Sequence, residues 1–116
     1  MSVSWNLRLS VQEGRLEAGR ALMDEMVAST LQEAGTLGYE WFLDGDGTTC
    51  HILERYADSD AVLAHLGTFG AQFAQRFLQC FAPTGLTVYG DPSPEARTAL
   101  DGFGAVYLGT WGGFVH

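Results

Sequence analysis

The hydrophobic residues of this chain change their spacing from every second residue to every third or fourth and back, and this order constrains the fold most. Residues 3–11 alternate apolar and polar side chains, which predicts a strand with one buried face. A stripe of apolar residues with the 3.6-residue period then predicts a helix over about 15–34, ended by Gly35. The chain therefore begins with a strand followed by an amphipathic helix.

A β-hairpin is expected after this helix. Residues 37–43 and 48–56 are rich in aromatic and β-branched side chains, and the Asp-Gly-Asp-Gly segment 44–47 between them is typical of a turn. A symmetric tight turn would place Glu40 opposite His51, which predicts an ion pair between them. One face of the hairpin then carries Leu37, Tyr39, Trp41, Cys50, Ile52 and Glu54. The other face carries Glu40, Phe42, His51, Leu53 and Arg55.

The second half of the chain continues with helical and strand-like segments. Residues 58–60 supply the N-cap and the first acidic side chain of a helix that begins at Ala61. A helical stripe of phenylalanines follows, at every fourth position, and ends before Pro83: Phe69, Phe73, Phe77 and Phe81. The remaining pattern predicts a strand at 86–90, a short helix opened by residues 93–95 and a glycine-rich strand at 103–111.

The resulting order is β-α-β-β-α-β, followed by α-β. It predicts an α+β fold with a ferredoxin-like antiparallel sheet and helices on one face. A chain of 116 residues is expected to form a single domain, here residues 1–116. The opposite face of the sheet needs a cover, because Phe42 and Leu53 lie on it. We expect a second copy of the chain, stacked sheet to sheet, so the sequence predicts a homodimer.

The composition limits the kinds of partner that the protein is expected to bind and the cellular compartment in which we expect it. The chain has 14 acidic residues against six basic ones, a net charge of −8, and so lacks the Lys/Arg surface that nucleic acids and anionic membranes require. No apolar run is long enough to span a membrane, and residues 1–8 lack the features of a signal peptide, so we expect a cytoplasmic protein. Charged residues make up only 17% of the chain, below the usual quarter, which favours a surface partly covered by a partner.

Neither the cysteines nor the histidines are spaced as metal ligands. Cys50 and Cys80 belong to no CxxC pair and are expected to be small, buried thiols. His51 and Glu54 are three residues apart, which on a strand sends their side chains to opposite faces. The sequence therefore predicts no bound metal.

Three short motifs occur in a distinctive order. Gly35 precedes Tyr39-Glu40 on the second predicted strand, the third strand ends in Glu54-Arg55-Tyr56, and the next helix carries His65-Leu66. In this order and spacing they resemble the antibiotic biosynthesis monooxygenase (ABM) family of the dimeric α+β barrel superfamily. The resemblance covers about residues 3–90 and leaves a helix–strand extension of about 93–116. It implies a dimeric barrel with a pocket between sheet and helices in each subunit.

The resemblance also implies a reaction. In the best-understood members, dioxygen oxidises phenolic or quinol-like aromatic substrates without flavin, haem or metal, because a deprotonated phenol is electron-rich enough to pass an electron to oxygen. The implied function is a cofactor-independent monooxygenase acting on a small aromatic phenol or quinol. A non-catalytic small-molecule-binding barrel and a haem-binding relative are the alternatives. Haem degradation is disfavoured, since that branch carries a tryptophan where this chain has His65 and an iron-ligating histidine near Gln75.

The candidate site combines this resemblance with the chemistry of the residues. His65 is the candidate catalytic base or proton relay because imidazole titrates near neutrality. Glu54 is the candidate partner that orients it, and a structural carboxylate is the alternative. Many relatives have a second histidine where this chain has Gly70, so His65 would act without it. The candidate substrate contacts are Asn6, Tyr39, Trp41, Tyr56 and Phe69. The aromatic residues among them also fit a core role, and Asn6, on the polar face of the first strand, also fits a solvated or dimer-facing position.

Overall fold

The computed structural model describes residues 1–116. Its elements are β1 (Val3–Val11), α1 (Leu16–Leu31), β2 (Thr36–Leu43), β3 (Thr49–Tyr56), α2 (Ser59–Thr68), the π-helical turn η1 (Phe69–Phe73), α3 (Ala74–Cys80), β4 (Phe81–Gly90), α4 (Pro94–Asp101) and β5 (Ala105–Leu108). This order confirms the predicted succession of helices and strands. None of the helices combines the length and the apolar composition that crossing a membrane requires.

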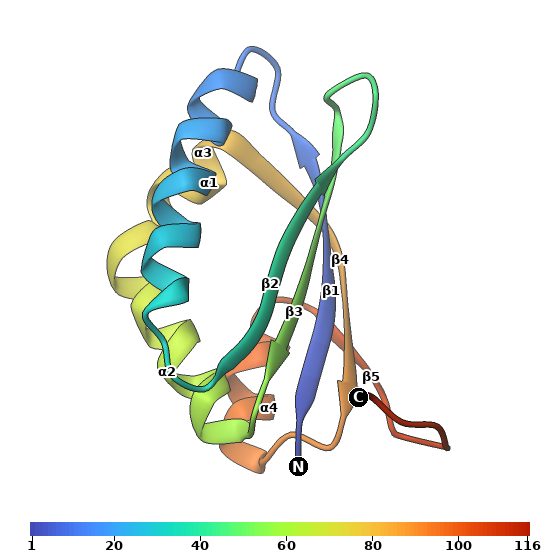
Figure 1. The fold of residues 1–116 in the computed structure, drawn as a ribbon. Helices are drawn as coiled ribbons and strands as arrows, with labels where there is room; N and C mark the ends of the chain where they lie inside the picture. Colours follow the sequence, from blue (N-terminus) through green and yellow to red (C-terminus); the bar gives the residue numbers. More distant parts are fainter.

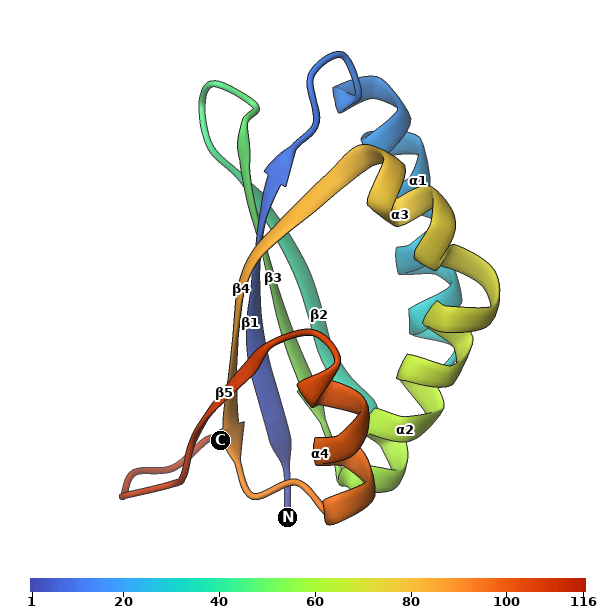
Figure 2. The same ribbon diagram turned by 180° about the vertical axis from the view of Figure 1, so that it is seen from behind.

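The five strands form one sheet in the order β2-β3-β1-β4-β5, and all helices lie on one face of it (Figures 1 and 2). The predicted α+β, ferredoxin-like architecture is confirmed. The first four strands pair antiparallel, as expected, whereas β5 runs parallel to β4. This parallel edge arises because α4 connects the two strands as a crossover, which returns the chain to the same end of the sheet.

The hairpin has a longer loop than the symmetric turn that the sequence suggested. The Asp44 side chain accepts hydrogen bonds from the backbone N–H groups of Thr48 and Thr49, at 2.9 and 3.1 Å, which organises the loop before β3 begins. As a result Glu40 lies opposite Leu53, and the predicted Glu40–His51 ion pair does not form. The shift is by two residues, so the paired side chains from Gly38 to Leu43 keep their predicted faces, whereas Leu37 falls in an irregularity of the pairing and is exposed.

The helix that the phenylalanine stripe predicts is divided into three parts. After α2, the turn η1 follows a π-helical path, in which the N–H of Ala74 donates to the carbonyl of Phe69. The helical segment ends at Cys80, and Phe81 has the extended backbone of β4. The strand therefore starts five residues before the predicted position, and the β1–β4 register shifts opposite Pro83, which cannot donate a ladder hydrogen bond. At the other end, β5 is shorter than predicted and begins after Phe103.

The core between sheet and helices consists of two clusters of buried residues. One cluster includes Leu9, Leu22, Met26, Ile52, Phe73, Phe77 and Phe81. The other includes Val3, Trp5, Tyr56, Val62, Leu86, Val88 and Leu100. Leu7, in the middle of β1, packs against both. The space between the clusters is not filled by side chains, and the cavity described below lies there.

Candidate functional site

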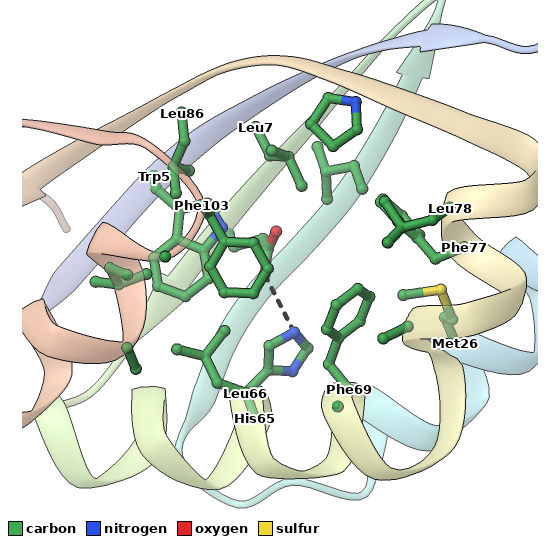
Figure 3. A pocket seen from close by; sticks show the side chains of 18 of the residues that line it. Trp5, Leu7, Met26, His65, Leu66, Phe69, Phe77, Leu78, Leu86 and Phe103 are labelled. Atoms are coloured by element: carbon green, nitrogen blue, oxygen red, sulfur yellow. Dashed lines mark ion pairs between the residues drawn. The ribbon is translucent and has the colours of Figure 1, made fainter.

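A cavity of about 540 Å³ lies between the sheet and the helices. Most of its wall is apolar, and residues from both core clusters contribute to it. Figure 3 shows side chains of both layers converging on it: Trp5, Leu7 and Leu86 from the strands, and His65, Leu66 and Phe69 from the helical layer. The volume falls within the range of small-molecule sites in proteins, which is about 300–1,000 Å³.

His65 reaches this cavity because α2 presents one face to the sheet. The helix begins at its N-cap Asp58, whose side chain accepts the N–H of Ala61 at 2.9 Å. Val62 and His65, three residues apart, are the buried residues of the helix, so both point towards the strands. His65 is only 7% exposed. The local sequence thus places an imidazole in an apolar interior.

Glu54 meets His65 from the sheet. It follows Ile52 on the inner face of β3 and is only 5% exposed. Its Oε1 atom lies 3.3 Å from Nε2 of His65, an ion pair that Figure 3 marks with a dashed line. The same oxygen accepts the hydroxyl of Tyr56 at 2.5 Å. A buried carboxylate is costly unless it is paired, and here two donors stabilise it.

Glu33 contacts the other side of the imidazole. It lies between α1 and β2, and its Oε1 atom is 2.9 Å from Nδ1 of His65. Thr36 donates its hydroxyl to the same oxygen at 2.8 Å. The absence of a side chain at Gly35 allows this approach, because a Cβ there would lie 2.5 Å from that of Ala61 on α2. We call Glu33, His65 and Glu54 the Glu-His-Glu cluster.

The charges of the cluster shift the titration of its members. Burial alone lowers the pKa of His65, but the hydrogen bond that His65 donates to Glu54 and the negative charges of Glu54 and Glu33 outweigh burial, so the pKa rises above its ordinary value. Burial and the nearby Glu54 raise the pKa of Tyr56 and of Tyr39, which keeps both phenols neutral near pH 7. The two carboxylates therefore favour the protonated form of His65, while the tyrosines act as hydrogen-bonding groups.

The structure brings together four of the residues that the sequence proposes for the site. His65, Glu54, Tyr39 and Phe69 all line the cavity. The other three lie elsewhere. Tyr56 stacks on Trp5, with ring centroids 4.7 Å apart, and reaches the site only through Glu54. Trp41 lines a second cavity of about 310 Å³ near the N-terminal end of α1.

Asn6 lies on the face of the sheet opposite the cavity. Its neighbours Trp5 and Leu7 point into the cavity, so the alternation of β1 turns Asn6 towards the other face. There it is paired in register with Leu53 and Thr87. The same alternation that predicted the strand also placed Asn6 on its polar side.

Sequence reasoning missed two parts of the site. Glu33 is separated from His65 by 32 residues, and no motif connects them. The other part is the far wall of the cavity, to which the C-terminal extension contributes Ala99, Leu100, Gly102 and Phe103. The ring of Phe103 packs against Phe69, with centroids 6.2 Å apart. A phenylalanine between two glycines was the available signal for this wall.

No group of three or more His, Cys, Asp or Glu side chains is arranged so that it could hold a metal ion. Cys50 and Cys80 are both buried and unpaired. Burial raises the pKa of the Cys50 thiol to about 11, so it remains protonated near neutrality. The polar chemistry of the cavity therefore belongs to the Glu-His-Glu cluster.

Comparisons with known proteins agree with this architecture. The model of the family described as antibiotic biosynthesis monooxygenase matches residues 3–79. MupZ from Pseudomonas fluorescens has a similar structure, with a TM-score of 0.84 and 21% sequence identity over 99% of this chain and 89% of that one. No curated protein matches the sequence.

Two further solved structures are similar over about four-fifths of the chain. SnoaB from Streptomyces nogalater, described as a cofactor-independent oxygenase, has a TM-score of 0.67 and 14% identity, covering 79% of this chain and 94% of its own. Rv0793 from Mycobacterium tuberculosis has a TM-score of 0.61 and 26% identity, covering 80% of this chain and 97% of its own. The match to MupZ extends over the C-terminal helix and strand as well.

Proposed function

Because the chain belongs to the antibiotic biosynthesis monooxygenase family, we propose that it oxidises a small aromatic phenol or quinol with dioxygen and without a bound cofactor. The observation that carries this proposal is an acid–base pair, His65 and Glu54, in the wall of a largely apolar cavity. The description of SnoaB as a cofactor-independent oxygenase supports it by analogy. Membership of the family supports monooxygenase-type chemistry in general, and the substrate class is our own proposal.

The cluster supplies the step that protein side chains can perform, which is removal of a proton. The O–H bond of the bound phenol breaks, its proton passes to the His65–Glu54 pair, and the phenolate left behind is electron-rich enough to reduce dioxygen. In a phenol with a free para position, one oxygen atom then replaces the ring hydrogen para to the hydroxyl, giving a quinone, and the other leaves as water. The substrate provides all the electrons, so the overall reaction is phenol plus dioxygen to quinone plus water.

The remaining wall orients the substrate. Tyr39 and Phe69 present aromatic rings to the cavity and could stack on a flat ligand. The apolar lining excludes water, which strengthens the interaction between a phenolate and the cluster. Holding the ring against the acid–base pair would lower the barrier further by fixing its orientation.

We also propose that the protein acts as a homodimer joined through the uncovered face of the sheet, which we call the outer face. Apolar side chains lie exposed on it, including Phe42, Leu53, Val106 and Leu108. Exposed apolar surface of this kind is typical of an interface. The cavity opens on the other side of the sheet, so such a dimer would leave both cavities accessible.

The test of the oxygenase proposal is dioxygen uptake by metal-free and flavin-free protein, with a panel of hydroquinones and polycyclic phenols. Wild type is compared with His65→Ala, and with His116→Ala in the exposed tail as the matched control. We expect uptake that requires the protein and that falls at least about tenfold in His65→Ala, a loss of about 1.4 kcal/mol of transition-state stabilisation. If no substrate of the panel raises uptake above buffer, the oxygenase proposal is wrong and ligand binding becomes the better account.

A further inference from the structure

His65 has a carboxylate oxygen at each of its ring nitrogens. Glu33 Oε1 lies 2.9 Å from Nδ1 and Glu54 Oε1 lies 3.3 Å from Nε2. A neutral imidazole has one N–H and one lone pair, so it would direct its lone pair at one of two acceptors. An imidazolium ion donates to both. The geometry therefore favours a His65 that is protonated at both nitrogens.

The other groups that face the ring do not oppose this charge. Tyr39 from β2 and Tyr56 from β3 lie with their ring centroids 5.6 and 5.2 Å from that of His65, and Trp5 from β1 is 6.5 Å away. No ion pair brings an arginine to the cluster, since Arg76 pairs with Glu25 and Arg97 with Asp91. Two carboxylates thus act on one imidazole, and they raise its pKa despite its burial.

Glu33 differs from the other two members of the cluster in its position. His65 and Glu54 line the cavity, whereas Glu33 does not, so a bound ligand would not touch it. Thr36 holds the same oxygen that contacts His65, while the other carboxylate oxygen, Oε2, is buried without a hydrogen-bond partner. An unsatisfied buried acceptor lowers stability and calls for an explanation. We infer that the cost of the unsatisfied oxygen of Glu33 is compensated by what its other oxygen does, which is to orient His65 and favour its positive charge.

We propose that Glu33 is the positioning residue of the site: by accepting Nδ1–H it keeps His65 doubly protonated, with Nε2–H directed at Glu54. His65 then has no lone pair with which to take a proton. The proton from the ligand hydroxyl passes instead to Glu54, and the phenolate forms beside an imidazolium ion. This assignment of the proton acceptor rests on the proposed function, whereas the protonation state of His65 does not.

The test is a ¹⁵N NMR titration of the histidine side chains in wild type, Glu33→Gln and the matched control Glu25→Gln. Glu25 is an exposed carboxylate paired with Arg76, so its substitution removes the same charge outside the cluster. There are three histidines, and His65→Ala identifies the signals of His65. In wild type at pH 7 we expect both nitrogens of His65 to be protonated.

In Glu33→Gln the titration midpoint of His65 should fall by about one pH unit or more, about tenfold weaker proton binding, and Glu25→Gln should leave it in place. A wild-type His65 with a single protonated nitrogen at pH 7, or a midpoint that Glu33→Gln does not move, would overturn the proposal. If Glu33→Gln fails to fold, Thr36→Val is the second variant. It removes the hydroxyl that donates to Oε1 of Glu33 and should also shift the titration midpoint of His65. An unchanged midpoint in that variant counts against the proposal as well.

Kinetics separate positioning from a merely structural role. With any substrate that supports uptake, activity should fall as the pH rises through the pKa of His65, and Glu33→Gln should move this limb of the kcat/KM profile to lower pH. Glu33→Asp, which keeps the negative charge, should return this limb part of the way to its wild-type pH. The NMR titration needs no substrate, so a failed oxygenase proposal and a failed role for Glu33 give different results.

Discussion

The two faces of the sheet contrast in what they bury and what they expose. On the inner face, which the helices cover, β3 carries Glu54 at 5% exposure beside His65 at 7%. On the outer face, which no helix covers, the adjacent residue Leu53 is 42% exposed and Phe42 is 48% exposed. A pair of ionisable groups is thus buried within an otherwise apolar inner layer, while large apolar side chains are exposed outside, and both features are unusual for a solitary domain.

This contrast fits our two proposals, a small ligand at the inner face and a second copy of the chain at the outer face. Inside, the carboxylates are stabilised by His65, Tyr56 and Thr36, and the cavity beside them is large enough for a small ligand. Outside, Leu53 and Phe42 expose apolar side chains. Such a surface fits the proposal that a second copy of the chain covers it.

The largest effect should come from placing a charge on the outer face. Leu53→Asp would have to bury a carboxylate in the proposed dimer interface, and we expect the dimer dissociation constant to rise at least about 100-fold, about 2.7 kcal/mol. Sedimentation equilibrium measures it. Gln75→Asp on the exposed side of α3 is the control and should not change association. If the wild type is a monomer, or if Leu53→Asp dimerises with unchanged affinity, the outer face is not the dimer interface.

A smaller effect should follow when the inner carboxylate loses a donor. Tyr56→Phe removes the buried hydroxyl that donates to Glu54 at 2.5 Å, and the free energy of unfolding should fall by about 2 kcal/mol, as for a hydrogen bond to a charged group. Urea denaturation gives the value. Tyr107→Phe is the matched control, because its hydroxyl donates to the exposed side chain of Asp101 at 2.7 Å, and it should cost less than about 1 kcal/mol. Equal losses of unfolding free energy in the two variants would show that the buried Tyr56–Glu54 hydrogen bond is not stronger than the exposed Tyr107–Asp101 hydrogen bond.

The smallest effect is a change of stability with pH. Since the folded state raises the pKa of His65, it binds the proton more tightly than the unfolded chain does, and this contribution is fully present below the unfolded pKa of about 6.5. It is lost as the pH rises through the folded pKa. The difference in unfolding free energy between wild type and His65→Asn should therefore decrease from pH 6 towards pH 9. A difference that grows over this range would contradict the role of the two carboxylates.

Much of the fold could be predicted because its signals are local. Alternation and helical periodicity identified the elements, and the hairpin faces were right despite the wrong register, because a shift of two residues keeps each paired side chain on its side. The start of β4 and the π-helical turn were missed, because both interrupt a phenylalanine stripe that continues with helical spacing through Phe81. The direction of β5 depends on how α4 packs, which the sequence does not show.

The residues of the site also fall into those that local sequence signals identified and those that depend on long-range packing. His65, Glu54, Tyr39 and Phe69 were found through motifs and through the face that each occupies. Glu33 could not be found, since it meets His65 only after the segment between α1 and β2 has packed against α2, a close approach that Gly35 allows. The wall formed by the C-terminal extension, with Phe103, also depends on long-range packing. Members of the site that belong to local motifs were thus visible in the sequence, whereas members that long-range packing brings in were not.

The most direct test of the central claim is a crystal structure of the protein with a phenol that supports uptake, prepared without dioxygen so that the ligand persists. We predict that the ring occupies the cavity, with a hydroxyl within about 3.2 Å of the carboxylate of Glu54, the reach of a proton transfer. A ligand bound on the outer face, or in the cavity with its hydroxyls turned away from Glu54 and His65, would contradict the account.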